Sequence, residues 1–273
     1  MLCFITLDAI MKYALQTHSL VQVTWGRFFF ATVFAAMICG RSLPQLTRSK
    51  VPKLQISRSI LLMVTTTLFN AGIVYVPLAT GTTIMFMSPI IVTLLSVVVL
   101  QEIVGIRRWL GILVGFFGAL IVVEPWNVGT SAFNVGALFL LAAAFSNAGY
   151  QIMTRRVRDD DPMTSLLFTA AFGAVVASLL LPAFWQWPTA IDWMLLMASG
   201  AAGALGHLCI IQALRYAPAS VVAPFSYSSL VWASLFGLLI WKELPQLNVW
   251  LGAALIVAAG LYIFLRERQL AKI

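Results

Sequence analysis

The residues of this chain that could do chemistry are charged, polar and aromatic side chains set within long apolar stretches. Asp8 and Lys12 are four positions apart, so on a helix they share one face and each could neutralise the other. Asp8 could instead accept a proton or hold an ammonium group of a small molecule. Arg27 could pair with a carboxylate or a helix C-terminus, or bind the carboxylate of a ligand. Ionisable side chains inside apolar spans are costly, which makes these residues functional candidates.

Amide, hydroxyl and aromatic side chains gather in some apolar stretches and are sparse in others. Asn147, Tyr150 and Gln151 are spaced by three and four, which places them on one helical face. Such a face can bind a carboxylate or ammonium group and an apolar side chain; alternatively, it only packs helices together. We expect these candidate binding residues to face one cavity: Asp8, Asn70, Tyr75, Thr83, Asn147, Tyr150, Gln151, His207, Tyr227 and Trp232.

Enzyme motifs do not occur in this sequence. His18 and His207 are its only histidines, and it has neither a His-Glu-x-x-His zinc motif nor a Gly-x-Ser-x-Gly nucleophile turn. Its three cysteines lie in apolar surroundings and are too few for a disulfide framework or a zinc site. We therefore expect no catalytic residue, metal or cofactor, and a membrane-embedded enzyme remains only a remote alternative.

Composition places these residues in a membrane. Of 273 residues, 61% are hydrophobic and 10% charged, whereas a soluble domain has about 45–50% and about 25%. At about 20 apolar residues per crossing, the chain has room for roughly ten spanning helices and for no sizeable aqueous domain. The first apolar run lacks a preceding basic region, so we expect no cleavable signal peptide. Its short length suggests that the chain begins inside its first helix.

Apolar runs bounded by prolines and charges define the expected helices. Pro89 within the fourth and Pro224 within the ninth remove backbone hydrogen bonds and could act as bending points. The expected spans are Leu2–Thr17, Val21–Cys39, Ile56–Tyr75, Leu78–Leu100, Trp109–Val123, Val135–Met153, Met163–Phe184, Ile191–Gln212, Ser220–Trp241 and Leu247–Leu265.

Basic residues between the spans predict the orientation. The connections after even-numbered helices and the C-terminal tail hold 13 Lys and Arg residues, whereas those after odd-numbered helices hold one, Lys242. By the positive-inside rule, both termini are cytoplasmic and the number of spans is even. Asp159, Asp160 and Asp161 lie beside a basic group, and we expect them to form a solvated loop.

The sequence contains an internal repeat with an offset of 141 residues. This offset aligns Pro77 with Pro218, Glu102 with Glu243, and Gly111 with Gly252, without a gap over about 45 positions. Each copy contains five predicted helices, so the second copy, residues 129–273, is inverted in the membrane relative to the first, residues 1–128. Inverted repeats are typical of secondary transporters, whose substrate sites lie near the midplane between the copies. Glu102 and Glu243 are expected to offset the dipole of the helix that follows each.

These motifs, taken in order, resemble the ten-helix EamA-type members of the drug/metabolite transporter superfamily. The first copy is similar in Lys12-Tyr13-Ala14-Leu15, Gly26-Arg27-Phe28, Ser88-Pro89, Glu102, Gly111 and Gly118. The second is similar in Gly136-Ala137-Leu138, Tyr150-Gln151, Arg155-Arg156, Ala213-Leu214-Arg215, Pro218-Ala219-Ser220, Glu243 and Gly252.

The resemblance implies alternating-access transport of small organic metabolites across the bacterial inner membrane. Export of amino acids, over a broad range that includes aromatic and apolar ones, is the expected activity, and uptake of another metabolite such as S-adenosylmethionine is the alternative. We expect an all-α protein whose two inverted five-helix repeats surround a central cavity. The expected partners are the small-molecule substrate and the lipid bilayer, with no nucleic acid, and the monomer is expected to function alone.

Overall fold

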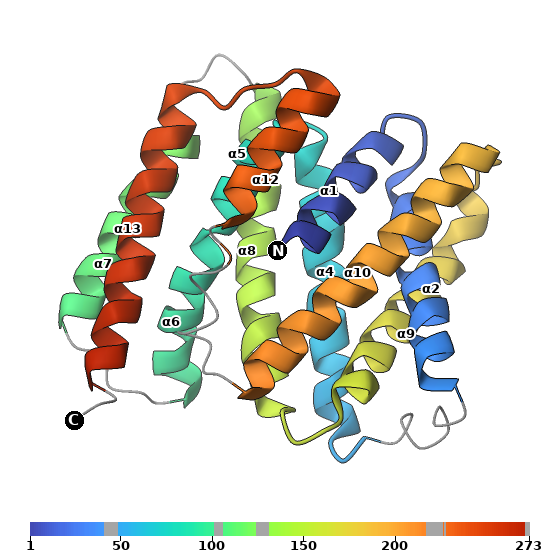
Figure 1. The fold of residues 1–273 in the computed structure, drawn as a ribbon, viewed down its shortest axis with the longest axis horizontal. Coiled ribbons are helices and arrows are strands. Elements are labelled where there is room, and N and C mark those ends of the chain that lie inside the picture. The colour runs from blue at the N-terminus through green and yellow to red at the C-terminus, as the bar shows by residue number, and fades with distance from the viewer. Residues whose placement is uncertain (41–48, 101–105, 124–130, 217–225, 227, 271–273) are drawn as a thin grey trace.

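The structure of this protein is a computed structural model that describes residues 1–40, 49–100, 106–123, 131–216, 226 and 228–270. Every regular element within these residues is a helix, and the helices form one bundle (Figure 1). The α-helices are α1 (Leu2–Ala14), α2 (Leu20–Cys39), α4 (Pro52–Ile73), α5 (Leu78–Met85), α6 (Met87–Leu100), α7 (Ile106–Val123), α8 (Ser131–Arg156), α9 (Pro162–Leu180), α10 (Ala190–Tyr216), α12 (Ser228–Phe236) and α13 (Leu247–Leu270). A 3-10 turn, η2 (Leu181–Ala183), and a π-helix, η4 (Gly237–Trp241), follow α9 and α12.

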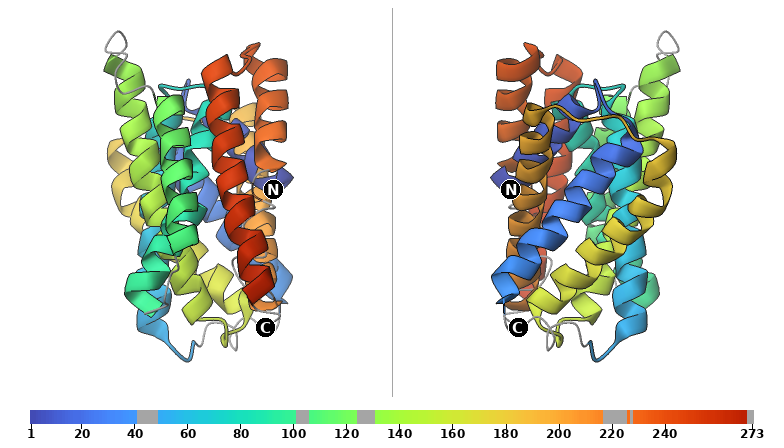
Figure 2. Two further views of the ribbon diagram at one scale, coloured as in Figure 1. Left: turned by 90° about the vertical axis from the view of Figure 1, so that its left-hand side faces the viewer. Right: turned by 90° about the vertical axis from the view of Figure 1, so that its right-hand side faces the viewer.

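Helices far apart in sequence pack side by side. Helix α4 lies along α8, α7 along α13, α2 against α9 and α10, and α1 against α10. The side views show that most helices run between the same two ends of the molecule (Figure 2). The connections α1–α2 and α12–α13 lie at the upper end of Figure 1, and the α8–α9 connection lies at the lower end.

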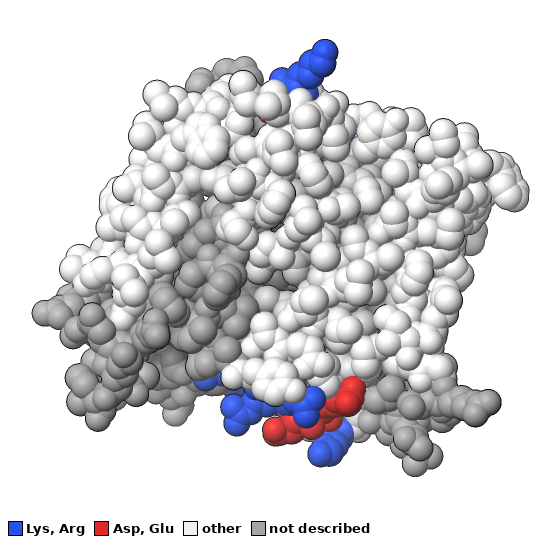
Figure 3. Space-filling model, viewed as in Figure 1, with Lys and Arg blue, Asp and Glu red and all other residues white. Residues whose placement is uncertain are grey.

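The surface of the bundle suits a bilayer. Among the described residues, five helices are long and apolar enough to cross a membrane: α2, α4, most of α8, α9 with η2, and α10. Large apolar side chains on the flanks are exposed, for example Met37, Leu179 and Ile191 at 71%, 77% and 68%. Charged side chains gather along the lower edge, whereas the face shown is otherwise nearly free of them (Figure 3). The protein is therefore an all-helical membrane protein.

Two of the predicted helices are interrupted. The helix expected over residues 78–100 is divided, because α5 ends at Met85 and α6 begins at Met87. Pro89 accounts for the break, since proline has no N–H to donate to the carbonyl of Met85 four residues earlier. The helix expected over residues 220–241 is described from Ser228 and changes to a π-helix at Gly237. Pro224 lies outside the described residues.

Glycines allow a close helix contact between α7 and α13. A Cβ at Gly118 would lie 2.9 Å from the carbonyl oxygen of Gly252, and a Cβ at Gly252 would lie 2.6 Å from that of Gly118. Any larger residue would push the two backbones apart. Gly118 of α7 and Gly252 of α13 thus serve close helix packing.

The lower end corrects the expectation of a solvated acidic loop at one residue, Asp160. Asp160 is only 6% exposed and accepts hydrogen bonds from the hydroxyl of Ser49, the backbone N–H of Lys50 and the amide of Gln55. Asp161 accepts from the N–H of Met163 at 2.7 Å and so caps the N-terminus of α9. Both carboxylates satisfy donors that would otherwise be unpaired; Asp160 is buried, whereas Asp159 and Asp161 are exposed.

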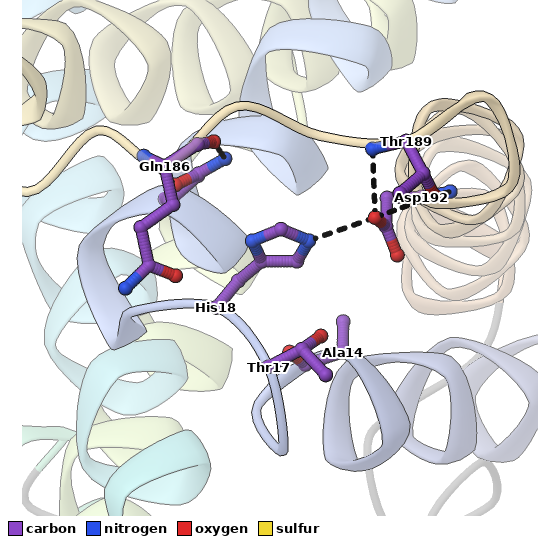
Figure 4. Close-up of polar contacts among 7 residues, drawn as sticks. Ala14, Thr17, His18, Gln186, Thr189 and Asp192 are labelled. Atoms are coloured by element: carbon purple, nitrogen blue, oxygen red, sulfur yellow. Dashed lines mark hydrogen bonds and ion pairs between the residues drawn. The ribbon is translucent and has the colours of Figure 1, made fainter.

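Polar contacts also join segments at the upper end. In Figure 4, His18 of the α1–α2 connection points toward the start of α10, with its Nε2 3.2 Å from Oδ2 of Asp192. Thr189 and Asp192 form a reciprocal cap of α10, in which the N–H of Asp192 donates to Oγ1 of Thr189, and both the N–H and the hydroxyl of Thr189 donate to Asp192. Gln22 and Gln186 exchange two hydrogen bonds nearby. These contacts hold α1, α2 and α10 together at this end.

Candidate functional site

A cavity of about 210 Å³ lies inside the bundle and is lined by residues of α1, α2, α4, α5, α6, α8, α10 and α12. Apolar side chains form much of its wall, among them Phe4, Phe69, Met85 and Phe86. Its charged and polar lining residues are Asp8, Arg27, Thr65, Thr66, Thr82, Ser88, Asn147, Tyr150, Gln151, His207, Ser226 and Ser229. Convergent polar groups in a mostly apolar cavity are typical of small-molecule sites.

The structure brings half of the predicted binding residues together in this cavity. These are Asp8 from α1, Asn147, Tyr150 and Gln151 from α8, and His207 from α10. The α8 residues do so because their spacing places them on one face of the helix.

The other predicted residues lie elsewhere or are not described. Asn70 is buried and 3.4 Å from the hydroxyl of Thr24, and the hydroxyl of Thr83 donates to a carbonyl of its own helix. Tyr75 is 48% exposed beyond the end of α4, and Trp232 packs against the hydrophobic core. None of these four lines the cavity. Tyr227 lies outside the described residues.

Two amides of α8 point at the break between α5 and α6. Nδ2 of Asn147 and Nε2 of Gln151 lie 3.1 and 3.2 Å from Oγ of Ser88, to which both donate. These contacts orient the two amides with their NH₂ groups toward Ser88. Within the described part of the chain, no donor is bonded to either amide oxygen, so both oxygens are available as acceptors.

Asp8 and Arg27 give the cavity one charge of each sign. Arg27 donates to the hydroxyl of Thr66 at 2.6 Å and to Nε2 of His207 at 3.0 Å. A guanidinium has five N–H donors, so several remain for a ligand. Asp8 has neither a hydrogen bond nor an ion pair within 4.0 Å among the described residues. The cavity therefore presents a carboxylate and a guanidinium that do not form an ion pair with each other.

Behind His207 lies a second arginine, which the sequence analysis did not identify. Arg58 of α4 is completely buried and donates to Thr154, to Gln55, to the carbonyl oxygen of Ser165 and, at 3.2 Å, to the hydroxyl of Tyr150. All of these acceptors are neutral. The hydroxyl of Tyr150 is in turn 3.3 Å from Nδ1 of His207. A buried chain of polar groups thus connects Arg58 to Arg27.

Lys12 has a partner other than the one its spacing suggested. Its Nζ donates to the carbonyl of Val76 at 3.1 Å and to Oε2 of Glu243 at 3.2 Å, and it lies 5.0 Å from the ring centroid of Trp241. The predicted Asp8–Lys12 pair does not form, because these three groups bind the ammonium, and Lys12 does not line the cavity. Glu243 pairs with Lys12 and is not the N-terminal cap of α13, which begins at Leu247. Glu102 lies outside the described residues.

Two threonines of α4, Thr65 and Thr66, also line the cavity, and the sequence analysis did not predict them. Thr65 and Thr66 belong to a run of three threonines, a residue that favours strands over helices. A run of threonines inside an apolar helix indicates a polar face, and this pattern could have identified Thr65 and Thr66. Arg58 left a weaker signal, because its partners lie 92 to 107 residues away in sequence, apart from Gln55.

The sequence matches the EamA-like transporter family over residues 1–124 and 134–265. The S-adenosylmethionine uptake transporter of Rickettsia felis is 28% identical over 264 residues, which cover 96% of this chain and 88% of the relative. The riboflavin transporter of Vibrio cholerae is 35% identical over 190 residues, 69% of this chain and 63% of the relative. The pseudopaline exporter of Pseudomonas aeruginosa is 27% identical over 260 residues, 94% of this chain and 90% of the relative.

A solved crystal structure shares the fold, with a TM-score of 0.65 at 18% identity over 98% of this chain and 97% of that chain. The family match extends over both halves of the sequence, and the helices that it covers enclose the cavity. The chain therefore belongs to the EamA-like transporter family and is a membrane transporter, not an enzyme.

Proposed function

We propose that this protein is a secondary carrier for small metabolites that bear an α-amino-acid group. The observation that carries this proposal is the cavity that Asp8 and Arg27 share without pairing. An α-amino acid has an ammonium for Asp8 and a carboxylate for Arg27, so the solute supplies the partners that the protein leaves open. A buried charge is costly unless it is paired or hydrogen-bonded, which favours a ligand of this kind.

Free amino acids, including apolar and aromatic ones, are the first candidate cargo. A volume of about 210 Å³ is below the ~300–1,000 Å³ typical of sites for drug-sized ligands. Phe4, Phe69 and Met85 offer an apolar wall to the side chain of the cargo. Such walls discriminate by only about 1–3 kcal/mol per methylene, so we expect a broad range of amino acids.

S-adenosylmethionine uptake is the second candidate. Relatives named for this uptake align with 96% of this chain, and the molecule carries the same α-amino-acid group. Its adenosine would need a wider cavity than the one observed. The reported relatives include uptake and export proteins and none named for amino acids, so the size of the cavity is the observation that favours free amino acids.

The transport cycle that we propose exposes the cavity alternately to the two sides of the bacterial inner membrane. Residues 1–128 and 129–273 would act as inverted repeats, which the close approach of Gly118 to Gly252 supports, since α7 and α13 occupy equivalent places in the two copies. The uneven distribution of basic residues supports cytoplasmic termini. One chain supplies all the lining residues, so we propose a functional monomer.

Counterflow in proteoliposomes tests this function. Vesicles preloaded with an unlabelled amino acid should accumulate the same amino acid in labelled form, and the Arg27→Met variant should reduce this strongly. Labelled S-adenosylmethionine, riboflavin and nucleotide sugars form the comparison panel. Transport of any of these without transport of amino acids would refute free amino acids as the cargo. Transport of S-adenosylmethionine and of no other compound in the panel would establish the second candidate.

A further inference from the structure

We propose that the hydroxyl hydrogen of Tyr150 is a fixed donor to the carboxylate of the transported solute, and that Arg58 is the positioning residue that directs it. The proposal rests on the proposed function, because it assumes a cargo with a carboxylate. It adds a specific donor and the cause of that donor's direction.

The first proton assignment is at His207. A guanidinium can only donate, so at the 3.0 Å contact between Arg27 and Nε2 of His207 the ring nitrogen accepts. A neutral imidazole has one acceptor nitrogen and one N–H. Nδ1 of His207 therefore carries the hydrogen and donates to the hydroxyl oxygen of Tyr150, 3.3 Å away.

The second assignment is at Tyr150. Arg58 also only donates, and its Nη2 lies 3.2 Å from the same hydroxyl oxygen. The oxygen thus accepts from His207 and from Arg58, so its own hydrogen points away from both. Among the residues that the structure describes, no acceptor is bonded to this hydroxyl. Tyr150 lines the cavity, so the hydrogen is presented to the solute.

Arg58 is rigid enough to impose this direction. It is completely buried, and its side chain is held by Thr154 at 2.8 Å, Gln55 at 2.8 Å and the carbonyl of Ser165 at 2.9 Å. These anchors come from α4, α8 and α9. Without Arg58, one lone pair of the Tyr150 hydroxyl is free and the O–H can rotate away from the cavity. Arg58 does not itself line the cavity of about 210 Å³, so its effect on the solute passes through Tyr150.

The transport test compares an amino acid with its carboxamide, which has the same amine and side chain but no carboxylate. Wild-type protein should prefer the acid in counterflow. Arg58→Met and Tyr150→Phe should each lower the ratio of acid to carboxamide transport about tenfold, the worth of one hydrogen bond to a charged group. The double variant should lose no more than either single variant, and Arg58→Lys should restore part of the ratio. The exposed Arg155→Met variant is the matched control and should leave the ratio unchanged.

A purely structural role for Arg58 would reduce transport of the acid and of the carboxamide alike. A wild-type preference for the acid that survives in both variants overturns the inference while leaving the proposed function intact. If Arg58→Met does not fold, Tyr150→Phe decides the question, because it keeps Arg58 in place. Failure of wild-type protein to carry any amino acid would instead refute the proposed function.

A second measurement is independent of the cargo. The chain has only two histidines, His18 and His207, so protein labelled with ¹⁵N-histidine contains two imidazoles, and a His18→Gln variant assigns them. We expect His207 to carry its hydrogen on Nδ1. A hydrogen on Nε2, or on both nitrogens, would overturn the proton order on which the inference depends.

Discussion

Removing the Asp160 carboxylate should destabilise the lower end of the bundle in a way that depends on pH. Burial raises the pKa of Asp160, but hydrogen bonds from Ser49, Gln55 and the N–H of Lys50, together with the charge of Lys50, lower it more. The net result is a pKa below the usual value. A carboxylate whose pKa is depressed by folding stabilises the fold above its unfolded pKa of about 3.9. That stabilisation is lost as the pH falls through the folded pKa.

The contacts of Asp160 set the expected magnitude. In Asp160→Ala the N–H of Lys50 and the hydroxyl of Ser49 lose their acceptor, whereas Gln55 keeps a bond to Ser165 at 2.9 Å. Each hydrogen bond to a charged group is worth about 1.5–3 kcal/mol, and the site lies near the surface, so we expect a total of about 2 kcal/mol. For a protein of this size, that lowers Tm by about 4–8 °C.

Thermal unfolding in detergent, followed by tryptophan fluorescence from pH 3 to pH 7, measures this effect. The difference in Tm between wild type and Asp160→Ala should be largest at neutral pH and should decrease below about pH 4. Asp159→Asn is the matched control, because Asp159 is an exposed neighbour of Asp160. An equal loss in both variants, or a difference that grows as the pH falls, would refute the reasoning.

Three further substitutions test the packing and the cavity. Lys12→Met removes the bonds to Val76 and Glu243 and should cost about 1–2 kcal/mol, whereas the exposed Lys53→Met should cost little; chemical unfolding measures both. In Gly252→Ala the new Cβ would lie 2.6 Å from a carbonyl oxygen of α7, so we expect about 1–3 kcal/mol of destabilisation by overpacking, seen as a lower Tm. Asn147→Ala leaves Ser88 bonded to Gln151 and should lower transport at unchanged Tm. A decrease in both transport and Tm would instead show that Asn147 serves helix packing.

The sequence predicted the helices well because hydrophobicity and proline position are local signals. It also predicted the polar face of α8, since three residues at helical spacing must share a face. It could not predict which polar residues are satisfied within their own helices, as Thr83 is, or which lie beyond the helix end, as Tyr75 does. Those outcomes depend on the rotation and ends of each helix, which packing decides.

Pairings between distant segments were the hardest to predict. Lys12 is paired with Glu243, 231 residues away, although Asp8 is only four residues from it. Asp160 is buried because the start of α4 brings Gln55 to it. Arg58 could be assigned no role until its neighbours on α8 and α9 were known. In each case the sequence predicts the helix that contains the residue, but the partner of the residue depends on tertiary packing.

Access to the cavity from both sides of the membrane tests the central claim most directly. Thr65→Cys, in a background in which Cys3, Cys39 and Cys209 are replaced, places a thiol in the cavity, and Ser59→Cys on the same helix is a buried control that does not line it. We predict that a membrane-impermeant thiol reagent modifies Thr65→Cys from either side and that transported amino acids slow the reaction, while Ser59→Cys stays unmodified. Modification from one side only, with no protection by any solute, would contradict a carrier that exposes this cavity alternately.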